Sequence, residues 1–144
     1  MIHTGHCLCG GVRFEVRGDL GPPVACHCQY CRRAHGSPFS IVSLIRRSDL
    51  HFTAGKELLT VWDTAGGGQR VFCSRCGTRI GNYPRKYPGS VSLVLGTLDA
   101  ELERGPVAHV NVESKAPWYE IADGAPQFDA LPKGAEEALA KGEG

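Results

Sequence analysis

The sequence predicts a mainly β protein of packed antiparallel sheets with little helix. Short segments that are apolar, or that alternate apolar with charged residues, recur along the 144 residues, and 19 glycines and 9 prolines punctuate them. Short segments bounded by turn residues are typical of strands. The length fits a single domain over residues 1–144, with a core at about 3–125 and a short polar tail.

The elements follow in chain order. Residues 12–16 alternate apolar and charged side chains, and residues 39–45 are apolar and β-branched, so both predict strands. Further extended segments are predicted at 24–28, 50–53, 58–62, 69–73, 78–83, 90–97 and 107–112. Residues 29–34 predict one helical turn, and 135–141 a short terminal helix. Residues 54–56 predict a hairpin turn between the strands on either side, and the glycines at 66–68 a flexible loop.

Charge and hydropathy exclude several classes of protein. A formal net charge of +1 without a basic arm is too small for strong binding to nucleic acid. No segment approaches the ~20 apolar residues of a membrane helix, and residues 1–11 lack the apolar run of a signal peptide, so we expect a cytoplasmic protein. Thiols stay reduced there, and the odd count of seven cysteines also favours metal ligands over disulfides.

Four cysteines have the spacing of a closed zinc site. Cys73-x-x-Cys76 followed by Gly77 is typical of a tight turn that aims two sulfurs at one metal, at about 2.3 Å each. A structural zinc needs four ligands, and Cys7-x-Cys9 is the natural second pair. The alternative is a redox C-x-x-C motif of the thioredoxin kind, but no helix start follows Cys76.

The other three cysteines predict an open zinc site. Cys26, Cys28 and Cys31 could reach one metal from a single turn, and three ligands with a free fourth position are the mark of a catalytic zinc. His27 and His35 lie close by in sequence, but we expect them to be hydrogen-bonded or solvated rather than ligands. An iron–sulfur cluster is the alternative, although it normally takes four cysteines.

Charge narrows the chemistry of the open site. Zinc with three thiolates carries a net −1, is a weak Lewis acid and suits a further thiolate as fourth ligand. Arg32 and Arg33 follow directly, with Arg46 and Arg47 further on. Each arginine alone is explained by solubility, but as a group they could hold the carboxylates of an acidic ligand. The hypothesis is a small thiol that carries carboxylates, of which glutathione is the obvious cytosolic candidate.

Four motifs together resemble a known family. Cys7-x-Cys9-Gly10, the run CHCQYCRRAHGSPF from Cys26, FCSRCGT from residue 72 and HVNVESKAPW from residue 109 resemble the glutathione-dependent formaldehyde-activating family, which includes centromere protein V. The resemblance implies an Mss4-like fold and two zinc ions per chain. It implies structural zinc ligands at Cys7, Cys9, Cys73 and Cys76, and catalytic zinc ligands at Cys26, Cys28 and Cys31.

The implied activity is a carbon–sulfur lyase reaction run in reverse, in which glutathione as co-substrate joins formaldehyde or another small aldehyde as S-hydroxymethylglutathione. The alternatives are a non-catalytic carrier of glutathione or another thiol, and a zinc-stabilised interaction module. A zinc deaminase is excluded, because no histidine is followed two residues later by glutamate. No pattern predicts an oligomeric state.

Several side chains near these motifs carry weaker expectations. We expect Trp62 to pack in the sheet and Trp118 to pack in the core or plug a strand end, the alternative for Trp118 being a pocket wall shared with Ser114 and Lys115. Tyr30 and Phe39 are expected to flank the open site. Either Ser37 or Ser40 is expected to donate a hydrogen bond to a ligand sulfur.

Overall fold

A computed structural model describes residues 1–65 and 68–134, and it confirms the mainly β fold with little helix. Within these residues one α-helix, α1 (Gln29–His35), accompanies ten strands. The strands are β1 (Ile2–His6), β2 (Arg13–Arg17), β3 (Val24–Cys26), β4 (Ser40–Arg46), β5 (Leu50–Ala54), β6 (Leu59–Asp63), β7 (Gln69–Cys73), β8 (Arg79–Tyr83), β9 (Ser90–Val94) and β10 (Ala108–Val110).

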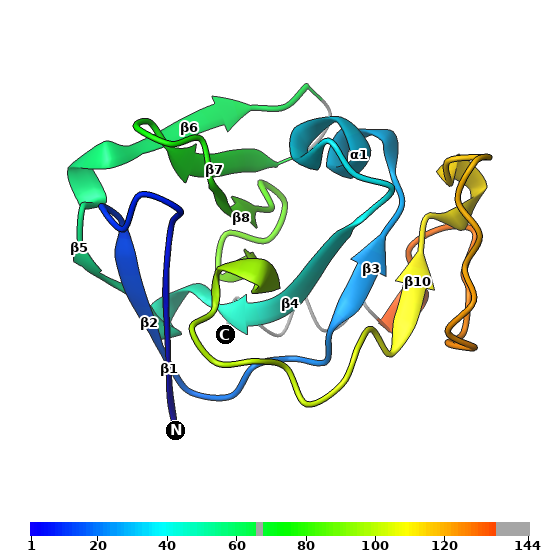
Figure 1. Ribbon diagram of the computed structural model, residues 1–144, viewed down its shortest axis with the longest axis horizontal. Coiled ribbons are helices and arrows are strands. Elements are labelled where there is room, and N and C mark those ends of the chain that lie inside the picture. The colour runs from blue at the N-terminus through cyan, green and yellow to red at the C-terminus, as the bar shows by residue number, and fades with distance from the viewer. Residues whose placement is uncertain (66–67, 135–144) are drawn as a thin grey trace.

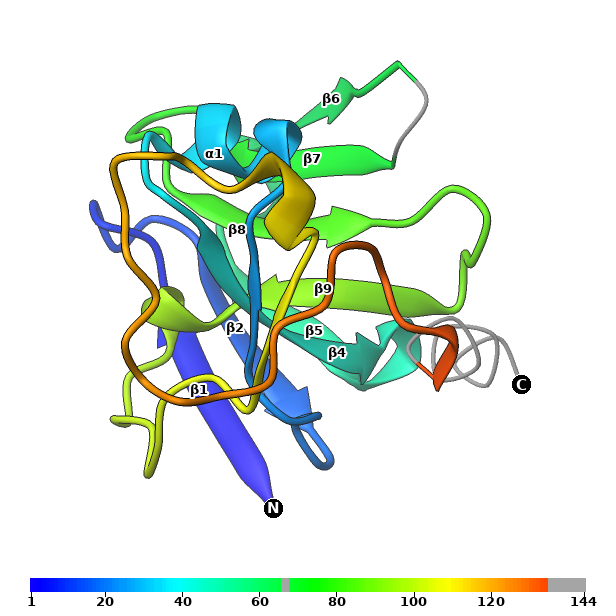
Figure 2. The same ribbon diagram turned by 90° about the vertical axis from the view of Figure 1, so that its right-hand side faces the viewer.

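The strands form two sheets (Figure 1). The smaller sheet has the order β1-β2-β5, and the larger has the order β10-β3-β4-β9-β8-β7-β6. All paired strands are antiparallel except β10 and β3, which run parallel at one edge. Figure 2 shows α1 beside β7, next to the edge strand β6 of the larger sheet. Within the described residues the sheets are therefore accompanied by one short helix rather than by a helical layer.

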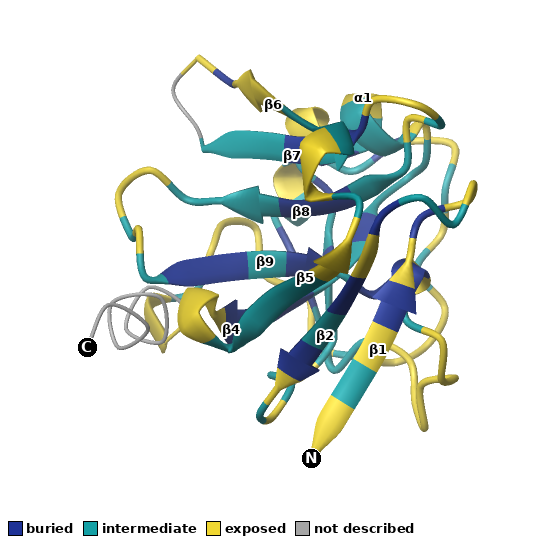
Figure 3. Cartoon of the chain, turned by 90° about the vertical axis from the view of Figure 1, so that its left-hand side faces the viewer, coloured by how far each residue is buried: buried dark blue, intermediate teal, exposed yellow. Residues whose placement is uncertain are grey.

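The core lies between the two sheets. Alternation along β2 turns Phe14 and Val16 inward and leaves the strand ends exposed (Figure 3). Phe14 meets Phe52 of β5 edge to face, with ring centroids 6.5 Å apart. The buried cluster is Cys7, Val12, Phe14, Val16, Ile45, Cys73, Ile80, Val91 and Leu93. Two of its members are cysteines from turns far apart in sequence, so the core and the cysteine chemistry meet.

The predicted hairpin at residues 54–56 is wrong. Strand β5 pairs with β2 in the smaller sheet, whereas β6 pairs with β7 in the larger one. The connection is a crossover between sheets that passes through Gly55 at φ +73°, close to the backbone of Gly11. A glycine between two strands indicates a turn but not which strands it joins, because pairing depends on contacts outside the turn.

Other boundaries differ from the prediction in smaller ways. Strand β1 was not predicted because its five residues are mostly polar and exposed. The predicted strand at 90–97 ends at Val94, and Leu95–Thr97 form a 3₁₀ turn. Trp62 does not pack in the sheet: it is 68% exposed on the edge strand β6. The predicted helix at 135–141 and part of the predicted loop at 66–68 lie outside the described residues.

Within the described ranges no helix combines the length and the apolar character needed to cross a bilayer.

The crossover glycine gives a test of the fold. A Cβ at Gly55 would lie 2.0 Å from the carbonyl oxygen of Gly11, and φ is positive there. We expect Gly55→Ala to lower the free energy of unfolding by about 3 kcal/mol, from backbone strain plus overpacking. The matched control is Gly36→Ala, also at positive φ but with nothing within 4 Å, for which about 1 kcal/mol is expected. Urea denaturation measures both, and equal losses would contradict the close-approach argument.

Candidate metal centres

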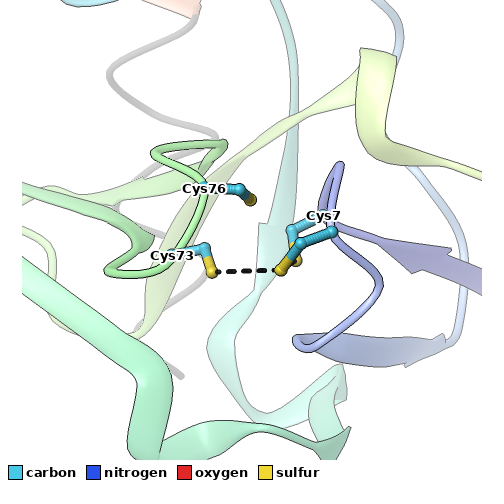
Figure 4. A group of neighbouring side chains, drawn as sticks. Cys7, Cys73 and Cys76 are labelled. Atoms are coloured by element: carbon cyan, nitrogen blue, oxygen red, sulfur yellow. Dashed lines mark hydrogen bonds between the residues drawn. The ribbon is translucent and has the colours of Figure 1, made fainter.

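The first group of cysteines brings together two turns from different sheets. The sulfurs of Cys7, Cys9, Cys73 and Cys76 lie within 4.8 Å of one another. Cys9 Sγ is 3.5 Å from Cys7 Sγ and 3.9 Å from Cys73 Sγ. A regular tetrahedron with metal–sulfur bonds of about 2.3 Å has edges of about 3.8 Å, so the donor set fits four-coordinate metal. Figure 4 shows the labelled side chains of Cys7, Cys73 and Cys76 converging on one point.

Local hydrogen bonds shape both turns. In the first turn, Cys7 N–H donates to Val12 O at 3.0 Å, and Val12 N–H donates to Cys7 Sγ at 3.2 Å. In the second, Gly77 N–H donates to Cys73 O at 2.8 Å, and Gly77 has φ +77°. A direct bond of 2.9 Å from Leu8 N–H to Thr78 Oγ1 joins the two turns.

Thr78 also acts on the chemistry of this group. Hydrogen bonds from its side chain and backbone lower the pKa of Cys76 to about 5. Thr78 Oγ1 lies 3.2 Å from Cys76 Sγ. A thiol with a lowered pKa is a better metal ligand at neutral pH, because the thiolate binds the metal.

The second group surrounds the start of α1. Cys26 ends β3, Cys28 is the N-cap of α1 and Cys31 lies in its first turn, and the three sulfurs lie within 4.8 Å of one another. Cys31 N–H donates to Cys28 Sγ at 3.3 Å, the bond by which an N-cap side chain satisfies the helix start. Helix capping thus places the second and third sulfurs together. The group could hold a metal ion and leave a coordination position free.

Two side chains that sequence reasoning missed donate to these sulfurs. Asn111 Nδ2 lies 3.3 Å from Cys26 Sγ, and Arg70 Nη1 lies 3.7 Å from Cys31 Sγ. Asn111 has φ +58°, a conformation that asparagine tolerates better than most residues. It lay inside the motif at residues 109–118, but only the parallel pairing of β10 with β3 brings it to Cys26.

The three thiols of this group share their protons unequally. Hydrogen bonds from Cys26 and Cys28 lower the pKa of Cys31, and Ser40 and the charge of Arg70 act in the same direction. The pKa of Cys26 is raised, first by its contacts with Cys28 and Cys31. The guanidinium of Arg70, 3.7 Å from Cys31 Sγ, favours a thiolate at Cys31. The hydrogen bond expected from Ser37 or Ser40 to a ligand sulfur is not formed by Ser40: it is buried near Cys31, but its Oγ has no hydrogen-bond partner among the described residues.

His27 is hydrogen-bonded away from the cysteines, as expected. Its Nε2 lies 2.8 Å from His109 Nδ1, and His109 Nε2 lies 2.8 Å from Asp123 Oδ2. Both rings are buried, whereas the carboxylate reaches the surface. Because the carboxylate accepts, His109 carries its proton on Nε2 and His27 donates to His109 Nδ1. These two hydrogen bonds join the segment after β3, which carries His27 among the ligand cysteines, to β10 and to the loop that contains Asp123.

A cavity of about 470 Å³ lies on the outer side of α1. Its lining residues are Gln29, Arg32, Arg33, Gly36, Ser37 and Trp118. Arg32 Nη1 also donates to Ser114 O at 2.9 Å. The expectation of core packing for Trp118 is wrong: its side chain is 70% exposed and forms one wall of the cavity. The sequence does not reveal the course of residues 111–117, which connect β10 to Trp118.

The remaining residues singled out from the sequence lie elsewhere. Arg47 stacks on the ring of Tyr83, 4.0 Å from its centroid, and so does not belong to this cavity. Phe39 packs on His27, with centroids 5.0 Å apart, behind the second group. Tyr30 is half exposed, and its hydroxyl donates to Ala65 O at 3.3 Å.

Comparison with known proteins adds sequence relatives. The family model described as "Glutathione-dependent formaldehyde-activating enzyme" matches residues 2–114. A Halomonas elongata protein named "Putative glutathione-dependent formaldehyde-activating enzyme" is 30% identical over 128 residues, covering 84% of this chain and 82% of its own. An Aspergillus flavus protein of the same name is 31% identical over 77 residues, which cover 52% of this chain but only 40% of that protein.

Among solved structures, a Rhodobacter sphaeroides protein has the same fold. It superposes with a TM-score of 0.61 at 24% identity, over 87% of this chain and 98% of its own.

Burial near the second group predicts a pH dependence. Desolvation, with the charge of Arg79, lowers the pKa of His35. His35 therefore binds a proton near pH 6.5 in the unfolded chain but only at lower pH in the folded chain. The free energy of unfolding falls as the pH drops below about 6.5. Between pH 7.5 and 5.5, wild type should lose up to about 1 kcal/mol more than His35→Gln. Urea unfolding at both pH values measures this, and equal losses would show that His35 titrates normally.

Proposed function

The chain belongs to the glutathione-dependent formaldehyde-activating family, and on this premise we propose that it is a zinc enzyme of the carbon–sulfur lyase type. Its substrates would be glutathione, or a similar thiol, and formaldehyde or another small aldehyde. The observation that carries the proposal is the second cysteine group. Its three sulfurs converge at the start of α1, and the two residues after Cys31, Arg32 and Arg33, line a cavity.

The donor sets support zinc at both groups. Both consist of thiols alone, which suit zinc better than hard cations, and tetrahedral zinc takes either four protein ligands or three with an open position. We assign Cys7, Cys9, Cys73 and Cys76 to a structural zinc, and Cys26, Cys28 and Cys31 to a catalytic one. Zinc bound at the second group would hold the incoming thiol as its thiolate at neutral pH.

The protein's own residues would bind and orient the thiol. Arg32 and Arg33 line the cavity, and guanidinium groups there would suit the carboxylates of glutathione. The exposed ring of Trp118 offers an apolar wall for the peptide body. Holding the thiol in this way brings its sulfur to the aldehyde in one orientation. In the reaction the sulfur–carbon bond forms, the carbonyl becomes a hydroxyl, and the thiol proton ends on that oxygen.

A thiol carrier without turnover is the second candidate. Among the described residues, Asn111 and Arg70 donate hydrogen bonds to sulfurs of the second group, and neither side chain gives up a proton near neutral pH. A carrier would bind glutathione at the same place and leave the rate of adduct formation at its spontaneous value. A stopped-flow comparison of that rate with and without protein separates the two functions.

Metal content and thiol binding can be measured together. Native mass spectrometry of the freshly purified protein should show two zinc ions per chain and, with glutathione added, one bound glutathione. Cys28→Ser should lose one zinc and the adduct while remaining folded, because the first group is intact. Cys76→Ser should instead unfold the protein or lower its stability by several kcal/mol. One zinc and no adduct in wild type would refute the assignment of the second group.

The arginine cavity has its own test. Arg33 is exposed and lines the cavity, so Arg33→Gln should weaken glutathione binding by about threefold, the size expected of an exposed ion pair. Binding of 2-mercaptoethanol, which carries no carboxylate, should not change. The control is Arg85→Gln, since Arg85 is paired with Asp63 elsewhere on the surface. Calorimetry measures all three proteins. An equal loss for both thiols would show that Arg33 does not recognise a carboxylate.

A further inference from the structure

Two arginines from neighbouring strands share one amide oxygen behind Cys31. Arg70 of β7 and Asn82 of β8 are register partners, and Arg70 Nη1 lies 3.1 Å from Asn82 Oδ1. Arg79 Nη2 lies 2.5 Å from the same oxygen. Arg70 Nη1 also lies 3.7 Å from Cys31 Sγ, so the pair of guanidiniums extends directly from the second cysteine group.

The two positive charges have no acidic partner among the described residues. Among the ion pairs of residues 1–65 and 68–134, none includes Arg70 or Arg79. Burial and the nearby charge of Arg70 lower the pKa of Arg79 to about 10, and its Nε is buried with no hydrogen-bond partner in the described part of the chain. Two like charges that are half-buried side by side destabilise a fold unless an anion lies within reach.

The cysteine group offers these charges a partner: Arg70 contacts Cys31 Sγ directly, and Arg79 is joined to Arg70 through Asn82. A zinc ion with three thiolates carries −1, and a fourth thiolate brings the centre to −2, whereas a neutral fourth ligand leaves it at −1. The two guanidinium charges balance the charge of −2 that the centre carries with a fourth thiolate. At a partly buried site, this one-unit difference in the charge of the centre favours a thiolate over a neutral ligand, because charges within a few ångströms interact by more than the thermal energy.

We propose that Arg70 and Arg79, joined by Asn82, are positioning residues whose charge makes the three-cysteine centre select an anionic thiolate over a neutral fourth ligand. The thiol releases its proton to solvent on binding. The inference rests on the proposed function, since it assumes that a thiol binds at this centre. It adds a source of ligand selectivity that is separate from the carboxylate contacts of Arg32 and Arg33.

The sharpest variant is Asn82→Asp, which keeps the shape of the side chain and places a carboxylate between the two guanidiniums. Zinc-loaded protein is titrated calorimetrically with 2-mercaptoethanol and with imidazole, and native mass spectrometry checks that two zinc ions remain. We expect 2-mercaptoethanol to bind about tenfold more weakly and imidazole to change less than twofold. The unfolding midpoint should rise by about 3 °C, because the arginines gain a permanent partner.

Arg85→Gln is the matched control, because it also changes the net charge by −1 but acts at the exposed pair with Asp63. It should alter neither affinity. A second pair of variants covers a failure of Asn82→Asp to fold: Arg70→Gln should weaken 2-mercaptoethanol binding about tenfold, and Arg70→Lys should restore most of it.

The outcomes separate this inference from the proposed function. If wild type binds both thiols and Asn82→Asp binds 2-mercaptoethanol as well as wild type does, the inference is overturned and the proposed function stands. Weaker binding of glutathione alone would mean that the arginines hold a substrate carboxylate, which also overturns it. If wild type binds no thiol, the proposed function falls first.

Discussion

The fold depends on the closure of two distant turns on one another. The turn after β1 carries Cys7 and Cys9, and the turn between β7 and β8 carries Cys73 and Cys76, 64 positions after Cys9. Cys7 and Cys73 are fully buried members of the core, so the contact is part of the packing between the sheets. A small core gains little stability from burial alone, and a tetrahedral metal at this point would add a constraint that the apolar contacts do not supply.

The geometry of the second cysteine group follows from that frame. Strand β3 delivers Cys26, and the cap of α1 delivers Cys28 and Cys31 within a few residues. The contacts around these sulfurs come from farther away: Asn111 follows β10, and Arg70 belongs to β7. The site therefore has a local set of ligands and a non-local set of hydrogen-bond donors. Such donors orient the ligands and adjust their charge.

The arginines near this centre fall into two classes that sequence reasoning did not separate. Arg32 and Arg33 line an open cavity, where they can meet a soluble anion. Arg70 and Arg79 are half-buried, and both donate to Asn82 beside the second cysteine group. Their surroundings decide the difference, because a charge beside an open cavity is screened by water, whereas a charge held next to a buried group interacts more strongly.

The sequence by itself determined the fold class, most strand positions and the two cysteine groups, because these depend on local alternation and on spacings of one to four residues. It could not determine which strands pair, as the crossover at Gly55 shows, nor the exposure of Trp62 and Trp118. Asn111, Arg70 and the chain from His27 to Asp123 were likewise decided by tertiary structure alone. Each of these contacts joins residues 14 or more positions apart. Over that distance the local sequence does not show which segments meet, because this depends on how the strands pair.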